Sequence, residues 1–346
     1  MSVFGESRKN AGGRRGAGLC LYGMTYSIGF QGAGTARANS DPMTPEGFVD
    51  LARELRLGFV EVEPRFISSD DLEADYAAFG NLAEESGLGV VCSTSVVTDR
   101  GQLEADLGRA SAMGAKTMRV LISRILEGDR AAIGGRAAWQ DRLEAFGDVV
   151  MSALRLAEEL GLTLAVENHQ DADSDDLAAL CERIGSNRFG IALDTANPLA
   201  VAEEPLVFAR RVLPWIKHVH LKDYRVFPSE SGYRLIRCAL GEGVIDFPSL
   251  LGLFRDRPEV TLSIEMAALQ ARHIRIHEEG YWDGFRPRTA RSLAPVLRLV
   301  AGHAESGDWR TPWELEQDDR LADWEMDQVR RSADYIASVL TGGPGH

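Results

Sequence analysis

The sequence predicts an α/β protein built as a single (β/α)₈ TIM barrel that carries a helical extension at its C-terminal end. Three observations support this fold class. Strand-like and helix-like segments alternate from residue 19 to about residue 303. Eight such pairs fit the length of roughly 250–280 residues that this barrel usually needs. In addition, four side chains of metal-ligating types stand at the C-terminal ends of four successive strand-like segments, where a barrel would gather them.

The predicted strands are short apolar runs. They are expected at residues 19–24, 58–63, 88–96, 115–122, 162–168, 189–194, 216–221 and 260–266. Amphipathic stretches lie between them. In the helix expected at 44–55, Thr44 can cap the N-terminus and Pro45 fits the first turn. The longest helix is expected over 135–161, where Gly161 suits the C-terminal end.

The alternation of side chains along the strands agrees with a barrel. In the fifth predicted strand, Ala165, Glu167 and His169 share one face, and Leu164 and Val166 share the other. We expect the apolar face to meet the outer helices. The small or polar face would then point inward, towards the mouth of the barrel.

Two segments are expected outside the barrel domain, which we assign to residues 19–303. Residues 1–18 are charged and glycine-rich without an apolar core, which predicts a flexible tail rather than a signal peptide. Residues 304–346 combine a polar stretch with a helical one, and we interpret them as an appended helix, with a partner-binding arm as the alternative. A doubly wound sheet is the alternative fold. The segment QGAGTAR at 31–37, however, lacks the third glycine position and the following helix of a phosphate-binding loop.

Composition excludes several classes of function. The net charge is 38 − 52 = −14, which makes nucleic acid and anionic membranes poor partners. No apolar run approaches the roughly 18 residues that a membrane-spanning helix needs. The four cysteines are scattered, without the spacing of a metal or redox site, which fits a reducing cytoplasm.

The four strand-end residues form the predicted metal site. They are Glu167, Asp194, His220 and Glu265. Three carboxylates and one imidazole make an oxygen-rich set that suits Mn²⁺ or Mg²⁺ and leaves positions open for substrate oxygens. A metal held in this way can stabilise an enediolate while a nearby base moves the proton on the carbon beside a carbonyl.

The segments VENH, LDTAN, HVHLKD, GEGVIDFPSLL and SIEM, in this order, resemble the xylose-isomerase-like TIM-barrel superfamily of sugar isomerases and epimerases. The resemblance covers roughly residues 19–303. It implies that the four residues above are the metal ligands and that Glu167 and Glu265 also act as an acid/base pair. It places His218 near the substrate.

Two positions depart from the ketose 3-epimerases of that superfamily. Asn197 stands three residues after the Asp ligand, where those enzymes have a histidine. Val226 stands six residues after the His ligand, where they have an arginine. These differences weaken the assignment to that particular branch.

His169 leads to an alternative reaction. It follows Glu167 by two residues on the same predicted face, so it is either a polar core histidine or a general base beside the metal. The lyases that deglycosylate 3-oxo-glycosides, including the C-glycoside deglycosidase α subunits, are similar in fold and carry a Glu-x-His of this type. By that resemblance, His169 would remove a proton next to the 3-oxo group and the aglycone would leave by β-elimination.

Further side chains are expected to contact the substrate. They are Glu63 on the inward face of the second strand, Asn197, His218, Asp223 as a contact or support for the ligands, and Trp282 stacking on a sugar or aglycone. Arg119 on the fourth strand could pair with the acids of the site.

The predicted function is therefore a metal-dependent isomerase or epimerase of a keto-sugar or sugar derivative, with the lyase as the second hypothesis. The expected partner is a small-molecule sugar or glycoside. The protein is expected to form a homo-oligomer or a complex with a small second subunit. A DNA-repair nuclease would need a cluster of histidines and a basic groove, and seven histidines with a charge of −14 argue against it. A non-catalytic sugar-binding barrel would retain four ligands without a chemical purpose.

Overall fold

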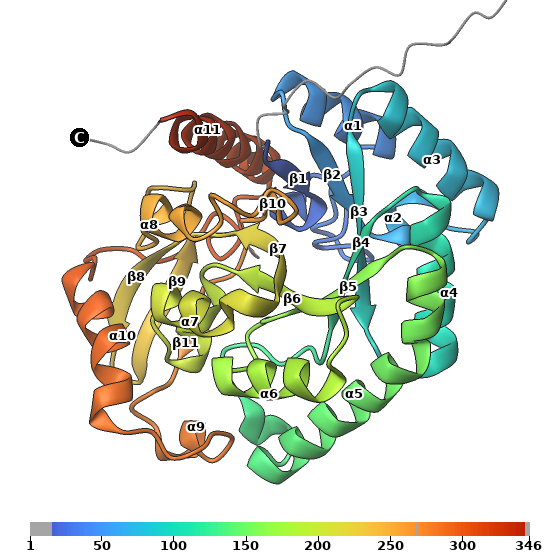
Figure 1. Cartoon of the computed structure of the whole chain (residues 1–346). Coiled ribbons are helices and arrows are strands. Elements are labelled where there is room, and N and C mark those ends of the chain that lie inside the picture. Colours follow the sequence, from blue (N-terminus) through green and yellow to red (C-terminus); the bar gives the residue numbers. More distant parts are fainter. Residues whose placement is uncertain (1–15, 267–268, 343–346) are drawn as a thin grey trace, which may run out of the picture.

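Eight parallel strands form a closed barrel in the computed structural model, which describes residues 16–266 and 269–342 (Figure 1). In order around the ring they are β1 (Gly18–Cys20), β10 (Thr261–Ile264), β7 (Ile216–Leu221), β6 (Phe189–Asp194), β5 (Thr163–Glu167), β4 (Thr117–Leu121), β3 (Gly89–Val96) and β2 (Phe59–Val62). The predicted (β/α)₈ barrel is confirmed.

Helices surround the barrel and follow the strands along the chain (Figure 1). The α-helices before the C-terminal extension are α1 (Pro45–Glu54), α2 (Pro64–Ile67), α3 (Glu73–Glu85), α4 (Arg100–Ala112), α5 (Gly135–Glu159), α6 (Ser174–Ile184), α7 (Pro205–Val212), α8 (Phe247–Gly252), α9 (Glu279–Trp282) and α10 (Ala290–Gly302). The 3₁₀ turns are η1 (Leu21–Met24), η2 (Arg130–Ile133), η3 (Asn197–Val201), η4 (Leu213–Trp215) and η5 (Asp318–Arg320).

Local sequence explains where these helices begin and end. The Thr44 hydroxyl accepts the backbone N–H of Gly47 at 3.2 Å, and Pro45 is the first residue of α1, as predicted. The long helix α5 ends at Glu159, and Gly161 follows with a φ of +69°, a conformation that favours glycine.

The faces of the strands agree with the predicted alternation. Leu164 and Val166 of β5 are fully buried in the main hydrophobic core, between the barrel and its helices. Glu167, at the end of the same strand, is directed into the pocket at the mouth. The barrel thus places apolar side chains outward and polar ones inward at this edge.

A three-stranded antiparallel sheet, which the sequence did not predict, lies beside the barrel. It consists of β8 (Tyr224–Ser229), β9 (Gly232–Arg237) and β11 (Arg272–Ile274), in the order β11–β9–β8. Gly232 permits the turn between β8 and β9: its φ is +151°, and a Cβ there would lie 2.2 Å from the carbonyl oxygen of Ile274. The predicted first strand is also shorter than expected, because Leu21–Met24 forms the turn η1.

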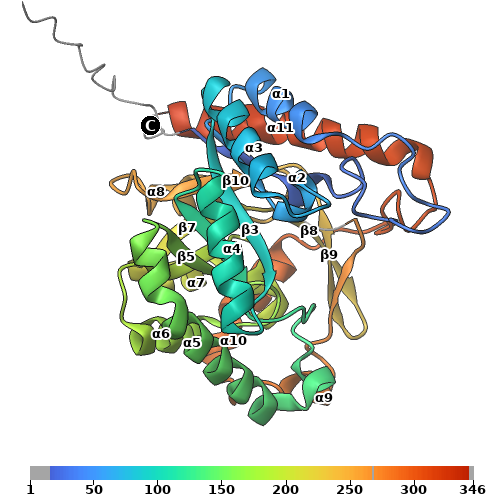
Figure 2. The same ribbon diagram turned by 90° about the vertical axis from the view of Figure 1, so that its right-hand side faces the viewer.

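The C-terminal extension contains the long helix α11 (Leu321–Thr341), which confirms the predicted appended helix. It runs along the barrel beside α1, and Arg330 of α11 forms an ion pair with Glu54 of α1 (Figure 2). Of the predicted tail at 1–18, residues 1–15 lie outside the described residues. None of the described helices is both long and apolar enough to cross a membrane.

Candidate metal centre and its pocket

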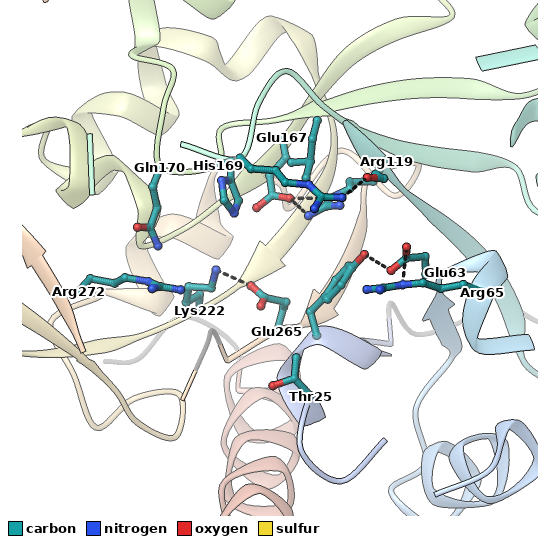
Figure 3. Close-up of a pocket in the computed structure, with 14 residues that line it drawn as sticks. Thr25, Glu63, Arg65, Arg119, Glu167, His169, Gln170, Lys222, Glu265 and Arg272 are labelled. Atoms are coloured by element: carbon teal, nitrogen blue, oxygen red, sulfur yellow. Dashed lines mark hydrogen bonds and ion pairs between the residues drawn. The ribbon is translucent and has the colours of Figure 1, made fainter. Parts of the chain in front are cut away.

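A pocket of about 260 Å³ opens where the barrel strands end, and most of its lining side chains are charged (Figure 3). The lining residues come from β3, β4, β5 and β11 and from the segments that follow β1, β2, β4, β5, β7 and β10. This is the edge at which a (β/α)₈ barrel usually carries its active site.

Three of the four predicted ligands approach one another at this edge. Glu167, Asp194 and His220 each offer one ligand atom, and these three atoms lie within 4.8 Å of one another. All three side chains are buried. The strands β5, β6 and β7 are neighbours in the barrel, where Glu167 pairs with Ala192 and Asp194 pairs with His220, which explains the convergence.

The orientation of His220 suits a metal ligand. Its Nε2 lies 2.9 Å from Glu61 Oε1, so an N–H at this position donates to the carboxylate. The other nitrogen, Nδ1, lies 3.8 Å from Glu167 Oε2 and has no hydrogen-bond partner among the described residues. A carboxylate behind the imidazole is a common support of metal-binding histidines, because it fixes the tautomer.

The charge of His220 is coupled to this arrangement. Burial disfavours the imidazolium, but the negative charges of Glu61 and Glu167 outweigh burial and raise the pKa of His220 to about 10. The ring would release its Nδ1 proton on binding a metal, so metal binding would depend on pH.

Glu61 is the buried hub of the site. The sequence predicts that Glu61 and Glu63 share the inward face of the second strand and that one of them could bind substrate hydroxyls, but it does not predict this role. Its two oxygens accept hydrogen bonds from Ser93 at 2.6 Å and Ser263 at 2.5 Å, and they contact His218 and His220, each at 2.9 Å. The side chain has no exposed surface. The period-two pattern of β2 placed it inward, but only the closed barrel shows which partners surround it.

Glu265 reaches the centre through a lysine. The Lys222 ammonium lies 2.5 Å from Asp194 Oδ2 and 2.6 Å from Glu265 Oε2. Burial disfavours its charge, but the two carboxylates outweigh burial and raise the pKa of Lys222 well above its usual value. The Lys222 ammonium therefore offsets the negative charge of Asp194 and Glu265.

Glu167 has its own cationic partner. Arg119 Nε donates to Glu167 Oε2 at 2.5 Å, and the terminal nitrogens of Arg119 contact the same oxygen and the carbonyl of Thr94. The predicted pairing of Arg119 with an acid of the site is thus confirmed. Burial alone would raise the pKa of Glu167, but Arg119 and His220 lower it well below its usual value.

These residues fit a hard divalent cation. The donors are carboxylate oxygens and one imidazole nitrogen, which suit Mn²⁺ or Mg²⁺. One buried ligand atom, His220 Nδ1, has no hydrogen-bond partner among the described residues. Lys222 touches Asp194 Oδ2, so the ammonium would have to withdraw before that oxygen could bind a metal.

His169 lines the same pocket and has a defined ring orientation (Figure 3). Its Nδ1 lies 3.2 Å from the carbonyl oxygen of Ile125, to which an N–H can donate. Burial lowers the pKa of His169 to about 4, which keeps the ring neutral and leaves Nε2 as a proton acceptor. The geometry is compatible with the predicted role as a base.

The other predicted substrate contacts fall into two groups. Glu63 lines the pocket and interacts with Tyr22 and Arg65. Asn197 is buried behind the pocket, where its amide lies 3.4 Å from Glu167 Oε1. Its contact is therefore with the carboxylate that is predicted to bind the metal.

Three predicted substrate contacts are used elsewhere, and none is among the described residues that line the pocket. His218 is buried between Glu61 and the hydroxyl of Thr261. The Asp223 carboxylate accepts four backbone N–H groups, from residues 224, 241, 243 and 245. The Trp282 ring donates its N–H to the carbonyl of residue 276 and packs against Tyr281. In each case a protein group occupies polar atoms of the side chain, and contact of these residues with a substrate stays a prediction.

Comparisons with known proteins place this site in a family. A D-psicose 3-epimerase structure from Clostridium cellulolyticum H10 aligns with 94% of this chain and 99% of its own, with a TM-score of 0.59 and 11% identity, which shows the fold alone. YihM of Escherichia coli K12 is 25% identical over 225 residues, 63% of this chain and 65% of YihM. An inosose dehydratase of Bacillus thuringiensis is 34% identical over 74 residues, 20% of this chain and 25% of its own. The chain thus spans less than two thirds of these curated relatives. Residues 49–283, more than half of the chain, match the family described as Xylose isomerase-like TIM barrel, and the chain belongs to this family.

Proposed function

We propose that this protein is a divalent-metal-dependent isomerase or epimerase that moves a proton next to the carbonyl group of a keto-sugar or sugar derivative. The observation that carries the proposal is the convergence of Glu167, Asp194 and His220 within 4.8 Å at the mouth of the barrel. Epimerases among the structural neighbours and dehydratases among the relatives agree with an enzyme of sugar metabolism.

The metal would be held by Glu167, Asp194, His220 and Glu265. A bound Mn²⁺ or Mg²⁺ would polarise the substrate carbonyl and acidify the hydrogen on the adjacent carbon. Glu61 holds the His220 ring so that Nδ1 faces the other ligands. Against the effect of burial, Arg119 holds the pKa of Glu167 and Lys222 holds the pKa of Glu265 below their usual values, whereas burial raises the pKa of Asp194 to about 7.

Proton transfer is assigned to side chains that face the same pocket. Glu167 and Glu265 both line it, from strands β5 and β10 on different sides of the ring, and they could act on opposite faces of a sugar carbon. His169 is a third candidate, because its ring is neutral and its Nδ1–H is directed to Ile125.

A lyase reaction by β-elimination is the second candidate. Val226, at the position of the epimerase arginine, is fully buried in β8 and cannot contact a sugar. Asn197 replaces the epimerase histidine and contacts Glu167. With both epimerase groups replaced and His169 available as a base, the same proton abstraction could expel a leaving group from a 3-oxo-glycoside.

A metal and substrate screen tests both candidates. The purified protein is freed of metal by chelation, reloaded with Mn²⁺ or Mg²⁺, and incubated in D₂O with free ketoses or 3-oxo-glycosides. Interconverted sugar with deuterium at the carbon beside the carbonyl supports the isomerase, and a released aglycone supports the lyase. Turnover that survives complete chelation would contradict the proposal.

Two variants assign the residues. Glu167→Gln should lower kcat by about 10²–10⁴-fold, because it removes both a ligand and a proton-transfer group. Glu144→Gln, on the exposed surface of α5, is the control and should retain activity. His169→Asn should abolish the lyase reaction but leave measurable isomerisation if Glu167 and Glu265 are the acid/base pair.

We also propose that the protein works in the cytoplasm, since all four of its cysteines are buried and free. A homo-oligomer or a complex with a small second subunit remains our proposal for its assembly.

A further inference from the structure

The pocket carries more positive than negative side chains, although the chain as a whole has a net charge of −14. The positive side chains of its lining are Arg65, Arg119, Arg124, Lys222 and Arg272, and the negative ones are Glu63, Glu167 and Glu265. An excess of positive charge in a recess of an acidic protein attracts anions locally.

Three of these cations are already paired with the three carboxylates. Arg65 lies 2.8 Å from Glu63, Arg119 binds Glu167, and Lys222 lies 2.6 Å from Glu265. Arg124 and Arg272 have no carboxylate within ion-pair distance among the residues that the structure describes. Arg124 is exposed and donates to the Ser95 hydroxyl.

Arg272 is the lining cation with a buried N–H group that no described residue accepts. Its Nε is shielded from solvent and has no hydrogen-bond partner within the described part of the chain. Figure 3 shows the side chain extended into the pocket, with its guanidinium end directed towards Lys222. An N–H that is removed from water without an acceptor is costly, so an incoming acceptor would be favoured there.

The backbone under Arg272 is held in place. Arg272 lies on β11, which pairs with β9 so that Arg272 stands opposite Leu235. The antiparallel sheet beside the barrel therefore delivers this guanidinium to the mouth.

Gln170 supplies a second donor at the same side of the pocket (Figure 3). Its Oε1 accepts the backbone N–H of Glu127 at 2.9 Å, which fixes the amide and leaves its NH₂ group as a donor.

We propose that Arg272, assisted by Gln170, binds an anionic group of the substrate, so that the substrate is an acidic sugar derivative carrying a carboxylate or a phosphate. The planar guanidinium fork matches both groups and forms charge-assisted hydrogen bonds with either. The proposal deepens the proposed function, on which it rests, because the acidic group would hold the sugar while its carbonyl lies at the metal centre.

Equilibrium binding tests this subsite without requiring turnover. Calorimetric titrations compare D-glucuronate, D-glucose 6-phosphate and D-glucose on the wild type, on Arg272→Gln and on Arg211→Gln. Arg211 is an exposed arginine of α7 paired with Asp175, so its replacement changes the net charge equally away from the pocket. Each titration is run with Mn²⁺ and after chelation, because an anion could also bind the metal.

We expect at least one acidic sugar to bind the wild type about tenfold or more tightly than D-glucose, with or without metal. Arg272→Gln should lose this preference, Arg272→Lys should keep part of it, and Arg211→Gln should keep all of it. The stronger of the two acidic sugars identifies the group as carboxylate or phosphate.

The subsite is refuted if the acidic sugars bind no better than D-glucose, or if a correctly folded Arg272→Gln protein retains the preference. Circular dichroism and the melting temperature of each variant establish that it is folded. If the protein shows no metal-dependent turnover but still prefers acidic sugars in a way that depends on Arg272, the proposed function alone is overturned. If it shows metal-dependent turnover but no such preference, the subsite alone is overturned.

Discussion

At the scale of single residues, Glu61 decides how His220 is presented. It accepts hydrogen bonds from two serines and contacts both histidines of β7, and all of these groups are buried. A glutamine would turn one acceptor oxygen into a donor NH₂ group facing other donors. Glu61→Gln should therefore reduce the free energy of unfolding by about 2–4 kcal/mol and weaken Mn²⁺ binding about 10–100-fold.

Urea denaturation and calorimetric Mn²⁺ titration measure these two effects. Glu63→Gln is the matched control, since Glu63 is two residues further along and faces the pocket with Tyr22 and Arg65 rather than His220. Unchanged Mn²⁺ affinity in Glu61→Gln would show that the histidine does not depend on this support.

A second prediction at the residue scale concerns Asp171. Burial raises the pKa of Asp171 to about 7, although the Ser123 hydroxyl, which donates to it at 2.5 Å, acts in the opposite direction. The folded protein thus holds a proton that the unfolded chain releases near pH 4. The contribution of this group to stability is fully present below about pH 4 and is lost as the pH rises to about 7.

Asp171→Asn removes this dependence, because the amide is neutral at every pH. Its stability relative to the wild type should rise by about 1–3 kcal/mol between pH 4 and pH 8. Denaturation curves at several pH values measure the difference. A constant difference across that range would mean that Asp171 is ionised throughout.

At the scale of elements, the segment between β9 and α8 is organised around Asp223. Its two carboxylate oxygens accept the backbone N–H groups of Tyr224, Gly241, Gly243 and Ile245. A Cβ on Gly243 would lie 2.3 Å from Asp223 Oδ1, so only glycine allows this close approach.

Asp223→Asn should destabilise the protein by about 2–3 kcal/mol, since an amide NH₂ group would then face backbone donors. Asp246→Asn is the control. Asp246 caps α8 by accepting the N–H of Ser249, and asparagine caps helices equally well. Urea denaturation compares the two, and equal stability of both variants would contradict the assigned role of Asp223.

At the scale of the whole molecule, α11 connects the C-terminal extension to the segment that follows the first barrel strand and η1. Glu325 of α11 is fully buried and accepts the backbone N–H groups of Tyr26 and Ser27 and the Ser27 hydroxyl. These residues follow η1, whose Tyr22 lines the pocket. The extension is thus a part of the barrel's support, and its alternative role as a partner-binding arm stays a prediction.

Glu325→Ala should cost about 3 kcal/mol or more of stability, because it leaves two buried N–H groups and the cation of Arg237 without this acceptor. Asp327→Ala, two residues further along α11, removes an exposed ion pair with Arg331 and should cost less than about 1 kcal/mol. Thermal denaturation distinguishes the two. If both variants lose a similar amount of stability, Glu325 is not the residue through which α11 stabilises the protein.

Sequence alone determined the barrel and the candidate ligands of this protein. Periodicity and the Thr44 cap are local properties, and parallel strands carry the residues at their C-terminal ends to one edge, so Glu167, Asp194 and His220 could be named in advance. Only the tertiary structure decided which partners these groups have. The antiparallel sheet with Arg272, the hub formed by Glu61 and the ammonium of Lys222 between two carboxylates arise from contacts between residues far apart in the chain. No local pattern encodes such contacts, because burial, hydrogen bonding and the pairing of charges depend on the neighbours that the closed barrel brings together.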